Sequence, residues 1–490
     1  MIYPERKEFL KLSRQGNLIP VYREIVADLE TPVSAFLKID RSRFSYLLES
    51  VEGAEKIARY SFIGTQPSLM AYSYKDTVIF EKRGKKTQVK TADPLKTIIS
   101  LMSVYKFVSS GTLPRFCGGL VGYIGYDMVR TFEKLPEKNQ DTLNLPDCVF
   151  MLTDTILIFD HIDHKIKIVC LAYTDKNPDE TYNNAIKKID IIIQRLRKPL
   201  YLKTTHSIKI TNAKVKANFT KKSFEKQVRK AKAYINAGDA IQIVLSQRFE
   251  TPVKCPPFDI YRALRSVNPS PYMYYIKMPQ VNIVGASPEV FVRCENKIVE
   301  VRPIAGTRPR GLSEAKDKRL EKELLNDPKE CAEHIMLVDL GRNDIGRICR
   351  YGSVKTLEFM VIEKYSHVMH IVSDCKGELL KGKTLIDVVK ATFPAGTVSG
   401  APKIRAMEII EELENVRRGL YAGCIGYFSF SGNLDTCIAI RTAIIKNNRA
   451  YVQAGAGIVA DSVPSKEYYE TVNKAEAMLK AIKIANEGLE

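Results

Sequence analysis

Two pairs of glutamates, each with members three residues apart, are the groups in this sequence best suited to chemistry. Glu330 and Glu333 lie in the segment DPKECAEHIMLVDLGRND, residues 327–344, and Glu467 and Glu470 lie near the C-terminus. Residues three apart are neighbours on a helix, so each pair would present two carboxylates on one side. Four hard oxygen donors from two helices would suit Mg²⁺, which combines carboxylates with water and an anionic substrate.

The first pair lies at the start of an expected helix. Asp327 can cap the first free amides, and Pro328 fits the first helical position. Gly341 is a natural stop. Residues 335–340 are apolar almost all round, which predicts that the helix lies inside a sizeable fold. Glu330 has a purely structural alternative, because it stands three residues after the cap and could complete a capping box.

The other carboxylates have structural alternatives as well. Glu333 could be an ordinary surface carboxylate. Glu470 and Lys474 stand at positions i and i+4 of the expected helix, so they could form a surface ion pair. The spacing alone therefore leaves both a metal site and a structural role open.

Three Gly-rich segments predict close backbone approaches to an anion. GAGIVA (455–460) matches a dinucleotide-binding pattern, but Pro464 and the lack of a βαβ unit exclude that site and leave a Gly-rich turn. PIAGTRPRG (303–311) predicts a second turn. FPAGTVSGAPKIRAM (393–407) runs from a small-residue loop into a helix, which is a ready anion site.

Two further side chains fit the same kind of site. His367 and His370 could pair on a metal, but no third ligand stands at zinc spacing, so we reject that reading. His370 could instead serve as an acid near neutral pH, or be a packed core residue. Arg441, in CIAIRTAII, is a cation in an expected buried strand and needs a carboxylate partner, which a substrate could supply.

The composition limits the class of protein. The chain has 490 residues, enough for two domains or one large intergrown one. No stretch approaches a membrane span, and the charged N-terminus has no signal core. Ten cysteines without a CxxC pair predict reduced thiols in the cytoplasm. The net charge of +19 is spread over the chain without a nucleic-acid-binding motif, which predicts a basic surface and no nucleic-acid partner.

The elements that must position these groups follow in mixed order. Strand pairs with short turns are expected at 68–90 and 148–174, and helices at 179–197 and 466–485. This irregular alternation predicts an α+β fold with large, mostly antiparallel sheets in a sandwich-like core surrounded by helices. The Lys/Thr-rich segment 198–222 is the expected boundary between an N-terminal region, residues 1–200, and a catalytic domain, residues 220–490.

Many short blocks along the chain together resemble the chorismate-utilising enzymes, and most closely the anthranilate synthase large subunits within that family. In the C-terminal half they run, in order, GDAIQIVLSQRF, NPSPYMYY, GASPE, RPIAGTRPRG, KECAEHIMLVDLGRND, VMHIVS, FPAGTVSGAPK, YAGCIGYF, AIRTA, QAGAGIVADS and ETVNKA. LLES, RYSFIG and GGLVGYIGYD extend the resemblance into the N-terminal half. The number and order of these motifs make the resemblance highly specific.

The resemblance implies a role for each group singled out above. Mg²⁺ would be held by Glu333 and Glu470 with the help of Glu330 and Glu467. The backbone amides expected at the ring carboxylate of chorismate are those of Gly306, Thr307 and Thr397. The residues expected at the enolpyruvyl carboxylate are Tyr421, Arg441, Gly455, Gly457 and Lys474. Proton transfer would fall to Glu289 and to His370, the latter near the departing 4-hydroxyl.

Two positions separate the sister enzymes of this family. Families that add water to chorismate carry a lysine where this chain has Gln242, and aminodeoxychorismate synthases typically carry a lysine where it has Ala305. The resemblance therefore implies addition of ammonia at C2 and formation of anthranilate and pyruvate, the first step of tryptophan biosynthesis. Aminodeoxychorismate synthase component I is the nearest alternative, and a catalytically silent, tryptophan-binding subunit is an alternative of another class.

The resemblance also implies two partners. The family's large subunits have no glutaminase, and this sequence has no Cys-nucleophile elbow, so a glutamine amidotransferase subunit in a heterotetramer would supply ammonia. L-Tryptophan would act as a feedback inhibitor. The residues that match the family's inhibitor pocket are Leu48, Glu49, Ser50, Pro271, Tyr272 and Met273. For LLES alone, a strand end packed on a neighbour is the structural alternative.

Overall fold

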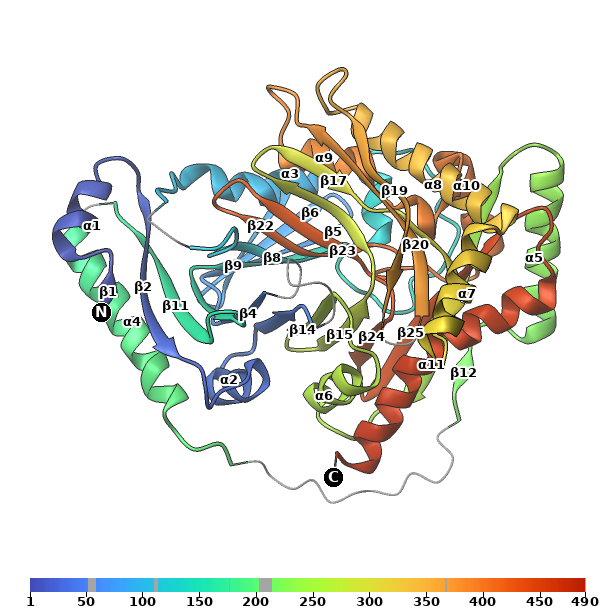
Figure 1. The fold of residues 1–490 in the computed structure, drawn as a ribbon. Coiled ribbons are helices and arrows are strands. Elements are labelled where there is room, and N and C mark those ends of the chain that lie inside the picture. The colour runs from blue at the N-terminus through green and yellow to red at the C-terminus, as the bar shows by residue number, and fades with distance from the viewer. Residues whose placement is uncertain (52–58, 110–112, 176, 202–213, 366–367, 490) are drawn as a thin grey trace.

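Two large sheets pack face to face, with helices on both outer surfaces (Figure 1). The computed structural model describes residues 1–51, 59–109, 113–175, 177–201, 214–365 and 368–489. Strand pairing within both sheets is antiparallel. The predicted α+β fold with mostly antiparallel sheets is therefore confirmed.

The first sheet has 13 strands among the described residues. In spatial order they are β1 (Ile2–Tyr3), β2 (Leu18–Val26), β11 (Lys165–Tyr173), β10 (Thr155–Asp160), β4 (Tyr60–Thr65), β3 (Ser45–Glu49), β14 (Tyr272–Lys277), β15 (Val281–Ser287), β24 (Thr442–Lys446), β25 (Arg449–Ile458), β13 (Gln242–Pro252) and β12 (Lys216–Ala217), with β21 (Gly400–Ala401) paired to β13.

The second sheet has 12 strands in the same part of the chain. In spatial order they are β18 (Ile304–Pro309), β20 (Val368–Glu378), β17 (Ile298–Val301), β16 (Val290–Glu295), β23 (Leu434–Ile438), β22 (Cys424–Ser429), β8 (Gly119–Ile124), β9 (Cys148–Thr153), β5 (Leu69–Tyr74), β6 (Thr77–Lys82) and β7 (Lys85–Lys90), with β19 (Lys355–Lys364) paired to β20.

The helices cover the outer faces of these sheets. They are α1 (Arg6–Leu12), α2 (Pro32–Ile39), α3 (Pro94–Ile99), α4 (Pro178–Leu196), α5 (Lys221–Asn236), α6 (Pro257–Val267), α7 (Glu314–Leu325), α8 (Pro328–Gly346), α9 (Leu385–Thr392), α10 (Lys403–Leu413) and α11 (Pro464–Glu487), with 3₁₀ turns η1 (Ser100–Val104), η2 (Tyr126–Thr131) and η3 (Gly396–Val398). No helix in the described ranges is long and apolar enough to cross a membrane.

Alternating side chains of the strands separate the core into layers. On β3, Tyr46 points to a cluster between the sheets that includes Tyr427 of β22, while Leu47 joins an outer cluster with Phe36 of α2. The outer cluster of the second sheet contains residues of α3, α8 and α9, such as Val338. This follows from the two-residue period of strands, which sends neighbours to opposite faces.

Both halves of the chain contribute to each sheet. β3 pairs with β14 in the first sheet, and β8 pairs with β22 in the second, where Gly122 lies opposite Gly426. The segment 198–222 therefore does not mark a border between the two sheets, because each sheet contains strands from both sides of it. Its central part, 202–213, lies outside the described residues. The division into residues 1–200 and 220–490 stays a prediction.

Candidate active site and inhibitor pocket

The helix that carries Glu330 and Glu333 is α8, which lies against β18 and β20. Figure 1 labels α8 and β20. Asp327 caps it as predicted, because its Oδ1 accepts from the amides of Lys329 at 3.0 Å and Glu330 at 3.3 Å. The predicted stop at Gly341 is wrong, since α8 continues to Gly346.

Two further expectations about α8 need correction. The apolar run 335–340 is not enclosed, since Ile335 is 44% exposed on the outer face of the helix. Gly341 does not end α8 but allows close packing, because a Cβ there would meet Val301 Cγ2 at 3.2 Å and Pro303 Cγ at 3.5 Å. Small size, not a left-handed turn, explains this glycine.

Glu330 is held by a cation rather than by a capping box. Its Oε1 accepts from Arg308 Nη1 at 3.2 Å, and Arg308 also pairs with Asp327 at 2.8 Å. Beside it, Gly306 interrupts the register of β18 with a φ of 66°, and a Cβ there would lie 3.3 Å from Glu330 Oε2. The predicted Gly-rich approach at Gly306 and Thr307 therefore lies next to the first carboxylate pair, as a bulge in a strand rather than a turn.

The second carboxylate of α8, Glu333, faces the strands of the first sheet. Its Oε1 accepts from Gln242 Nε2 at 2.8 Å. Burial raises the pKa of Glu333, and the nearby charges of Glu330 and Glu470 raise it further, while the bond from Gln242 opposes the shift. The two glutamate pairs on α8 and α11 thus lie close enough to repel each other.

The second pair lies at the start of α11. Glu467 is 8% exposed, and burial raises its pKa, opposed by a hydrogen bond from Ser462. Glu470 Oε1 lies 2.6 Å from Lys474 Nζ, so the ion pair of the structural alternative exists. Lys474 Nζ also donates to the carbonyl of Gly455 at 3.2 Å, which joins this pair to β25.

The carboxylates of the two glutamate pairs could hold Mg²⁺ only together with water molecules and a bound substrate. Among the described residues, no three carboxylate, histidine or cysteine side chains converge as a metal-ligand group. Glu333 nevertheless interacts electrostatically with both Glu330 and Glu470, and a divalent cation would relieve their mutual repulsion. Because Mg²⁺ commonly takes one or two carboxylates and completes its shell with water and a bound anion, these side chains are compatible with it.

Gly455 and Gly457 lie inside β25, so the predicted Gly-rich turn at 455–460 is wrong for these two residues. A Cβ at Gly455 would meet the hydroxyl of Tyr421 at 2.6 Å, and one at Gly457 would meet Gln242 Nε2 at 2.6 Å. The glycines therefore clear space in front of a strand, where backbone groups can approach a ligand closely.

Arg441 is not within a strand as predicted, but connects β23 to β24 with a φ of 52°. Its Nη1 donates to the carbonyl of Lys474, and no carboxylate of the described residues lies within ion-pair distance. Burial lowers the pKa of Arg441, opposed by Tyr421 and Glu470. A half-buried guanidinium without a carboxylate partner loses part of its hydration, and an anionic ligand would stabilise it.

Glu289 lies between β15 and β16 and is the most strongly perturbed acid of the site. Thr397 Oγ1 donates to its Oε1 at 2.9 Å. Burial raises the pKa of Glu289 to about 8, against the opposing effects of Thr397 and Lys474. Glu289 therefore carries a proton at neutral pH, as a general acid requires.

His370 on β20 lies beside the bulge of β18. Its Nδ1 is 2.9 Å from the carbonyl oxygen of Gly306 and 3.1 Å from Thr307 Oγ1. A carbonyl only accepts, so Nδ1 carries the hydrogen and Nε2 is the acceptor of the neutral ring. Burial lowers the pKa of His370, opposed by its bond to Gly306. This favours Glu289 as the proton donor near neutral pH and His370 as an acceptor.

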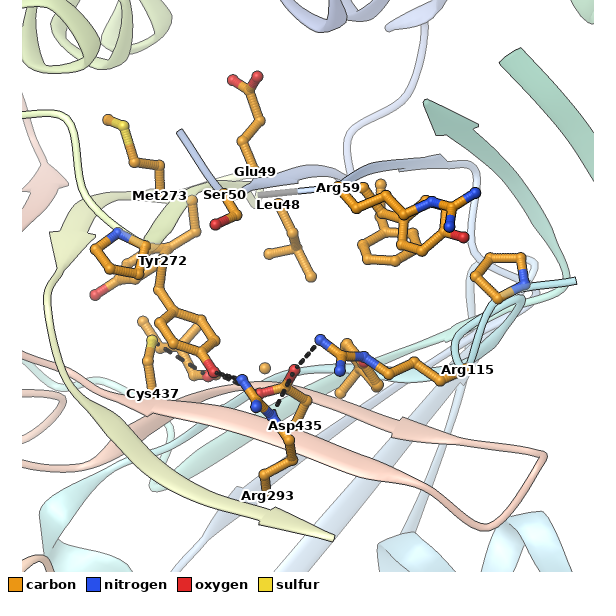
Figure 2. A pocket seen from close by; sticks show the side chains of 18 of the residues that line it. Leu48, Glu49, Ser50, Arg59, Arg115, Tyr272, Met273, Arg293, Asp435 and Cys437 are labelled. Atoms are coloured by element: carbon orange, nitrogen blue, oxygen red, sulfur yellow. Dashed lines mark hydrogen bonds and ion pairs between the residues drawn. The ribbon is translucent and has the colours of Figure 1, made fainter. Parts of the chain in front are cut away.

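The predicted inhibitor residues gather around a separate cavity of about 310 Å³ between the two sheets, and all six line it. Figure 2 shows Leu48 and Tyr272 pointing into the cavity, whereas Glu49 and Met273 point away from it. Glu49 instead accepts a hydrogen bond from Tyr261 of α6, and burial raises its pKa. Alternate side chains of LLES therefore face the cavity and the opposite side of β3, and the assignment of an inhibitor to this cavity stays a prediction.

The sequence analysis did not identify the charged residues at the floor of this cavity. Asp435 Oδ2 pairs with Arg115 Nη2 at 3.0 Å, and its Oδ1 accepts from the hydroxyl of Tyr272 at 2.8 Å (Figure 2). Arg293 Nη2 donates to the same hydroxyl at 2.8 Å. At the rim, Ser50 Oγ is buried without a hydrogen-bond partner in the described part of the chain. Apolar walls with a polar floor suit an aromatic amino acid.

Known proteins share both the sequence and the fold. Residues 45–480 match the family described as chorismate binding enzyme. Anthranilate synthase component 1 of Acetivibrio thermocellus is 50% identical over 99% of this chain and 100% of its own, and that of Aquifex aeolicus is 51% identical over 99% and 98%.

Solved structures of related proteins have a similar fold. The crystal structure of anthranilate synthase component I from Streptococcus pneumoniae matches with a TM-score of 0.76 and 39% identity over 93% of this chain and 98% of that one. The menaquinone-specific isochorismate synthase of Escherichia coli shares the fold, with a TM-score of 0.70 and 17% identity over 97% and 98%. The chain therefore belongs to the chorismate binding enzyme family, and its predicted resemblance to anthranilate synthase large subunits is confirmed over nearly its whole length.

Proposed function

We propose that this chain is the large subunit of an anthranilate synthase, which converts chorismate and ammonia to anthranilate and pyruvate. The observation that carries the proposal is the division of charge in the candidate site. Arg441 is half-buried without a carboxylate within ion-pair distance among the described residues, and two glutamate pairs lie in the same site. A small dicarboxylate such as chorismate complements both ends, one directly and one through a cation.

The ring carboxylate binds at the glutamate end. The backbone amides proposed to contact it are those of Gly306, Thr307 and Thr397, and the bulge at Gly306 supports a close approach. When bound, Mg²⁺ would neutralise charge that spreads into this carboxylate. The residues proposed to hold it are Glu330, Glu333, Glu467 and Glu470.

The enolpyruvyl carboxylate binds at the cationic end. Arg441 would contact it directly, and Lys474, already directed to Gly455, would lie close by. Tyr421 adds a hydroxyl beside the Gly455 backbone, and its buried setting raises its pKa to about 12, so the phenol stays protonated as a donor. The glycines of β25 leave room for this group, and the amide of Gly457 is its proposed backbone donor.

Glu289 and His370 both act on the departing 4-hydroxyl, one by giving a proton and the other by orienting it. Glu289 supplies the proton with which the 4-hydroxyl leaves as water while ammonia adds at C2. Neutral His370 orients that hydroxyl as a hydrogen-bond acceptor. Loss of the C2 proton and of pyruvate then gives the aromatic ring. Ammonia addition, rather than water addition, is supported by Gln242, which holds Glu333 where a lysine base would otherwise stand.

The cavity lined by β3 and β14 is the proposed site of feedback inhibition by L-tryptophan. Its size lies at the lower end of small-molecule pockets, and its apolar walls and charged floor fit an indole and an amino-acid group. Ser50 Oγ, buried without a partner in the described chain, supplies a free hydroxyl for the ligand.

A glutamine amidotransferase subunit is the proposed source of ammonia, in a heterotetramer with this chain. The relatives that match over nearly the full length are named component 1, which supports a second component. The proposed compartment is the cytoplasm. Aminodeoxychorismate synthase component I is the second candidate function, and Ala305, in place of the lysine typical of that enzyme, disfavours it.

One assay tests the reaction, the metal and the regulation together. The purified chain is mixed with chorismate, MgCl₂ and an ammonium salt at mildly alkaline pH, and anthranilate fluorescence is followed with and without tryptophan. We expect fluorescence that chelation by EDTA abolishes and tryptophan suppresses. A non-aromatic amino product would establish the aminodeoxychorismate branch instead, and tryptophan binding without turnover would overturn the catalytic proposal.

A further inference from the structure

Arg418 lies in the protein interior, three residues before Tyr421 of the candidate site. It is 2% exposed, and its charge is balanced within the protein, because Glu414 accepts from its Nε at 3.0 Å and from its Nη2 at 2.6 Å. Glu414 also accepts from the amide and the hydroxyl of Ser246, at 2.8 and 2.7 Å. Arg418 therefore differs from Arg441, since its charge already has a carboxylate partner and does not await an anionic ligand.

Two further hydrogen bonds of Arg418 reach backbone carbonyls from separate parts of the chain. Its Nη1 donates to Val398 at 2.7 Å, and its Nη2 donates to Val244 at 2.7 Å. Val398 ends η3 directly after Thr397, the proposed amide donor to the ring carboxylate. Val244 lies on β13 opposite Gly457 of β25. One guanidinium thus joins two backbone segments whose neighbours are proposed to contact chorismate.

Two tyrosine rings lie against the same guanidinium. Its Cζ is 5.4 Å from the centre of the Tyr421 ring and 4.7 Å from that of Tyr126 in η2, distances at which a cation and an aromatic ring attract each other. Burial raises the pKa of Tyr421, and the charge of Arg418 opposes that rise, which makes the phenol a better hydrogen-bond donor. Arg418 therefore contacts the Tyr421 ring directly and the Thr397 segment through Val398.

The energetics of such a group indicate positioning rather than stability. A buried ion pair is costly to desolvate and often stabilises a fold no more than apolar side chains of similar volume. A guanidinium is planar, however, and its N–H groups point in fixed directions, so it sets the relative placement of the groups that it binds. Lysine has a single ammonium and could not hold a carboxylate, two carbonyls and a ring at once.

We propose that Arg418 is a positioning residue that fixes the spacing between two carboxylate sites, one beside Thr397 and the other at Tyr421. The inference rests on the proposed function, which assigns these two sites to the two carboxylates of chorismate. Arg418 acts through the groups that it holds and does not touch the substrate. Its replacement should therefore weaken the binding of the dicarboxylate chorismate and leave the binding of ammonia unchanged.

Two arginines of the same neighbourhood make a matched test. Arg418→Lys keeps a positive charge beside Glu414 but loses the fixed arrangement of N–H groups. Arg130→Lys makes the same chemical change at a part-buried arginine, whose described hydrogen bonds go to Asp127, to Glu411 and to a carbonyl in the loop after η2. None of these described partners is proposed to contact chorismate.

A milder variant keeps the proposal testable if Arg418→Lys does not fold. Tyr126→Leu removes one of the two rings beside the guanidinium and leaves all hydrogen bonds of Arg418 in place. The hydroxyl of Tyr126 is buried without a hydrogen-bond partner in the described residues, so its removal breaks no described bond. Circular dichroism melting curves establish which variants are folded.

The first measurement is the initial rate of anthranilate formation, with chorismate and ammonium salt varied in turn. We expect Arg418→Lys to raise the KM for chorismate about tenfold, a change of ~1.4 kcal/mol, with the KM for ammonia within about twofold of wild type. Tyr126→Leu should raise the KM for chorismate less, and Arg130→Lys should leave both constants unchanged.

The second measurement combines each lysine variant with Tyr421→Phe. If Arg418 acts through Tyr421, loss of the phenol hydroxyl should matter less once the ring is no longer held. The rise in the KM for chorismate in the double variant should then be about fivefold smaller than the product of the two single effects, a coupling of ~1 kcal/mol. In the Arg130→Lys background, Tyr421→Phe should have its full effect.

The outcomes separate this inference from the proposed function. If wild type forms anthranilate but folded Arg418→Lys keeps the wild-type KM for chorismate, the positioning role is wrong and the function stands. An equal rise in both KM values, or effects that simply multiply with Tyr421→Phe, would also reject it, because either would show a general distortion. If only Tyr126→Leu folds, an unchanged KM for chorismate in that variant rejects the role. If wild type forms no anthranilate at all, the proposed function itself fails.

Discussion

The candidate inhibitor pocket and the candidate active site contain similar charged side chains, but they differ in how these charges are paired. In the inhibitor pocket the charges are satisfied within the protein, since Asp435 binds Arg115 and the hydroxyl of Tyr272, and the space above them is an open cavity of about 310 Å³. In the active site the charges are not balanced. Glu289 keeps a proton, with a pKa of about 8, and Arg441 has no carboxylate partner among the described residues.

This difference teaches what each region is built to do. A preformed cavity with paired charges binds a ligand by shape and apolar contact, at little electrostatic cost. An active site with unpaired buried charges is poised for groups that arrive with the substrate, and such perturbed side chains are typical of catalysis. Changes in the two regions should therefore separate binding of the inhibitor from turnover.

The largest expected effect is on turnover by Glu289→Gln. Glutamine keeps the shape and can still accept from Thr397 Oγ1, but it cannot give up the proton that the leaving hydroxyl needs. We expect kcat for anthranilate formation to fall by about 10³-fold, within the usual range for loss of a general acid. Steady-state fluorescence assays with purified protein measure it.

Tryptophan binding is the control for this variant. Because Glu289 does not line the candidate inhibitor cavity, calorimetry should give the same Kd for tryptophan in Glu289→Gln and wild type. A variant that keeps near-normal kcat would remove Glu289 from the mechanism. A large loss of tryptophan affinity would show that the two regions are not separable.

The next largest effect is expected on inhibition by tryptophan, in the variant Ser50→Phe. The phenyl ring would occupy the rim of the inhibitor cavity and exclude the ligand. We expect the concentration of tryptophan for half-inhibition to rise at least about a hundredfold, or ~2.7 kcal/mol, while activity remains. Ser50→Ala, which removes the hydroxyl without adding bulk, should have a smaller effect. Loss of activity with inhibition intact would refute the pocket assignment.

A smaller effect is expected on the rate of anthranilate formation, in the variant Ala305→Lys. Ala305 lies on β18, directly before Gly306 and opposite Ile371, the neighbour of His370 on β20. An added ammonium there places a cation and a competing amine close to the ring carboxylate site. We expect anthranilate formation to fall about tenfold, and Ala305→Met, of similar length but uncharged, to lose less. Equal activity in all three proteins would show that Ala305 does not set the product.

The periodicity of the sequence predicted the long helices, but it did not predict contacts between segments that are far apart in the chain. The expected helices 179–197 and 466–485 correspond to α4 and α11, because their patterns repeat over several turns. Gly341 and Gly455 were misread, since a glycine that makes room for a neighbour looks the same in sequence as one that turns the chain.

The site residues show the same limit. Motif resemblance named six of the seven cavity-lining residues in and next to β3 and β14, and missed Tyr274. It also missed the floor, where Arg293 and Asp435 face each other on paired strands and Arg115 joins them from the segment before β8. Arg308 was missed for the same reason, although it lies inside the quoted motif RPIAGTRPRG. Their partners are distant in sequence, so no spacing rule points to them.

The last prediction concerns stability, and it tests the electrostatic side of the comparison directly. Burial raises the pKa of Glu289 from an ordinary 4.5 to about 8, so the unfolded chain ionises this group at a lower pH than the folded one does. Its contribution to stability is therefore fully present below about pH 4.5 and is lost as the pH rises to about 8.

Glutamine does not titrate, so the variant does not lose this contribution. The unfolding free energy of Glu289→Gln minus that of wild type should therefore rise with pH over this window, by at most about 1.4 kcal/mol per pH unit, and stay constant above about pH 8. Paired melting curves at half-unit steps of pH measure the difference. Ser50→Ala, in the inhibitor cavity, removes no titrating group and should show no such trend. A flat difference for Glu289→Gln would mean that the buried carboxyl is as well compensated as Asp435, and the contrast between the two regions would disappear.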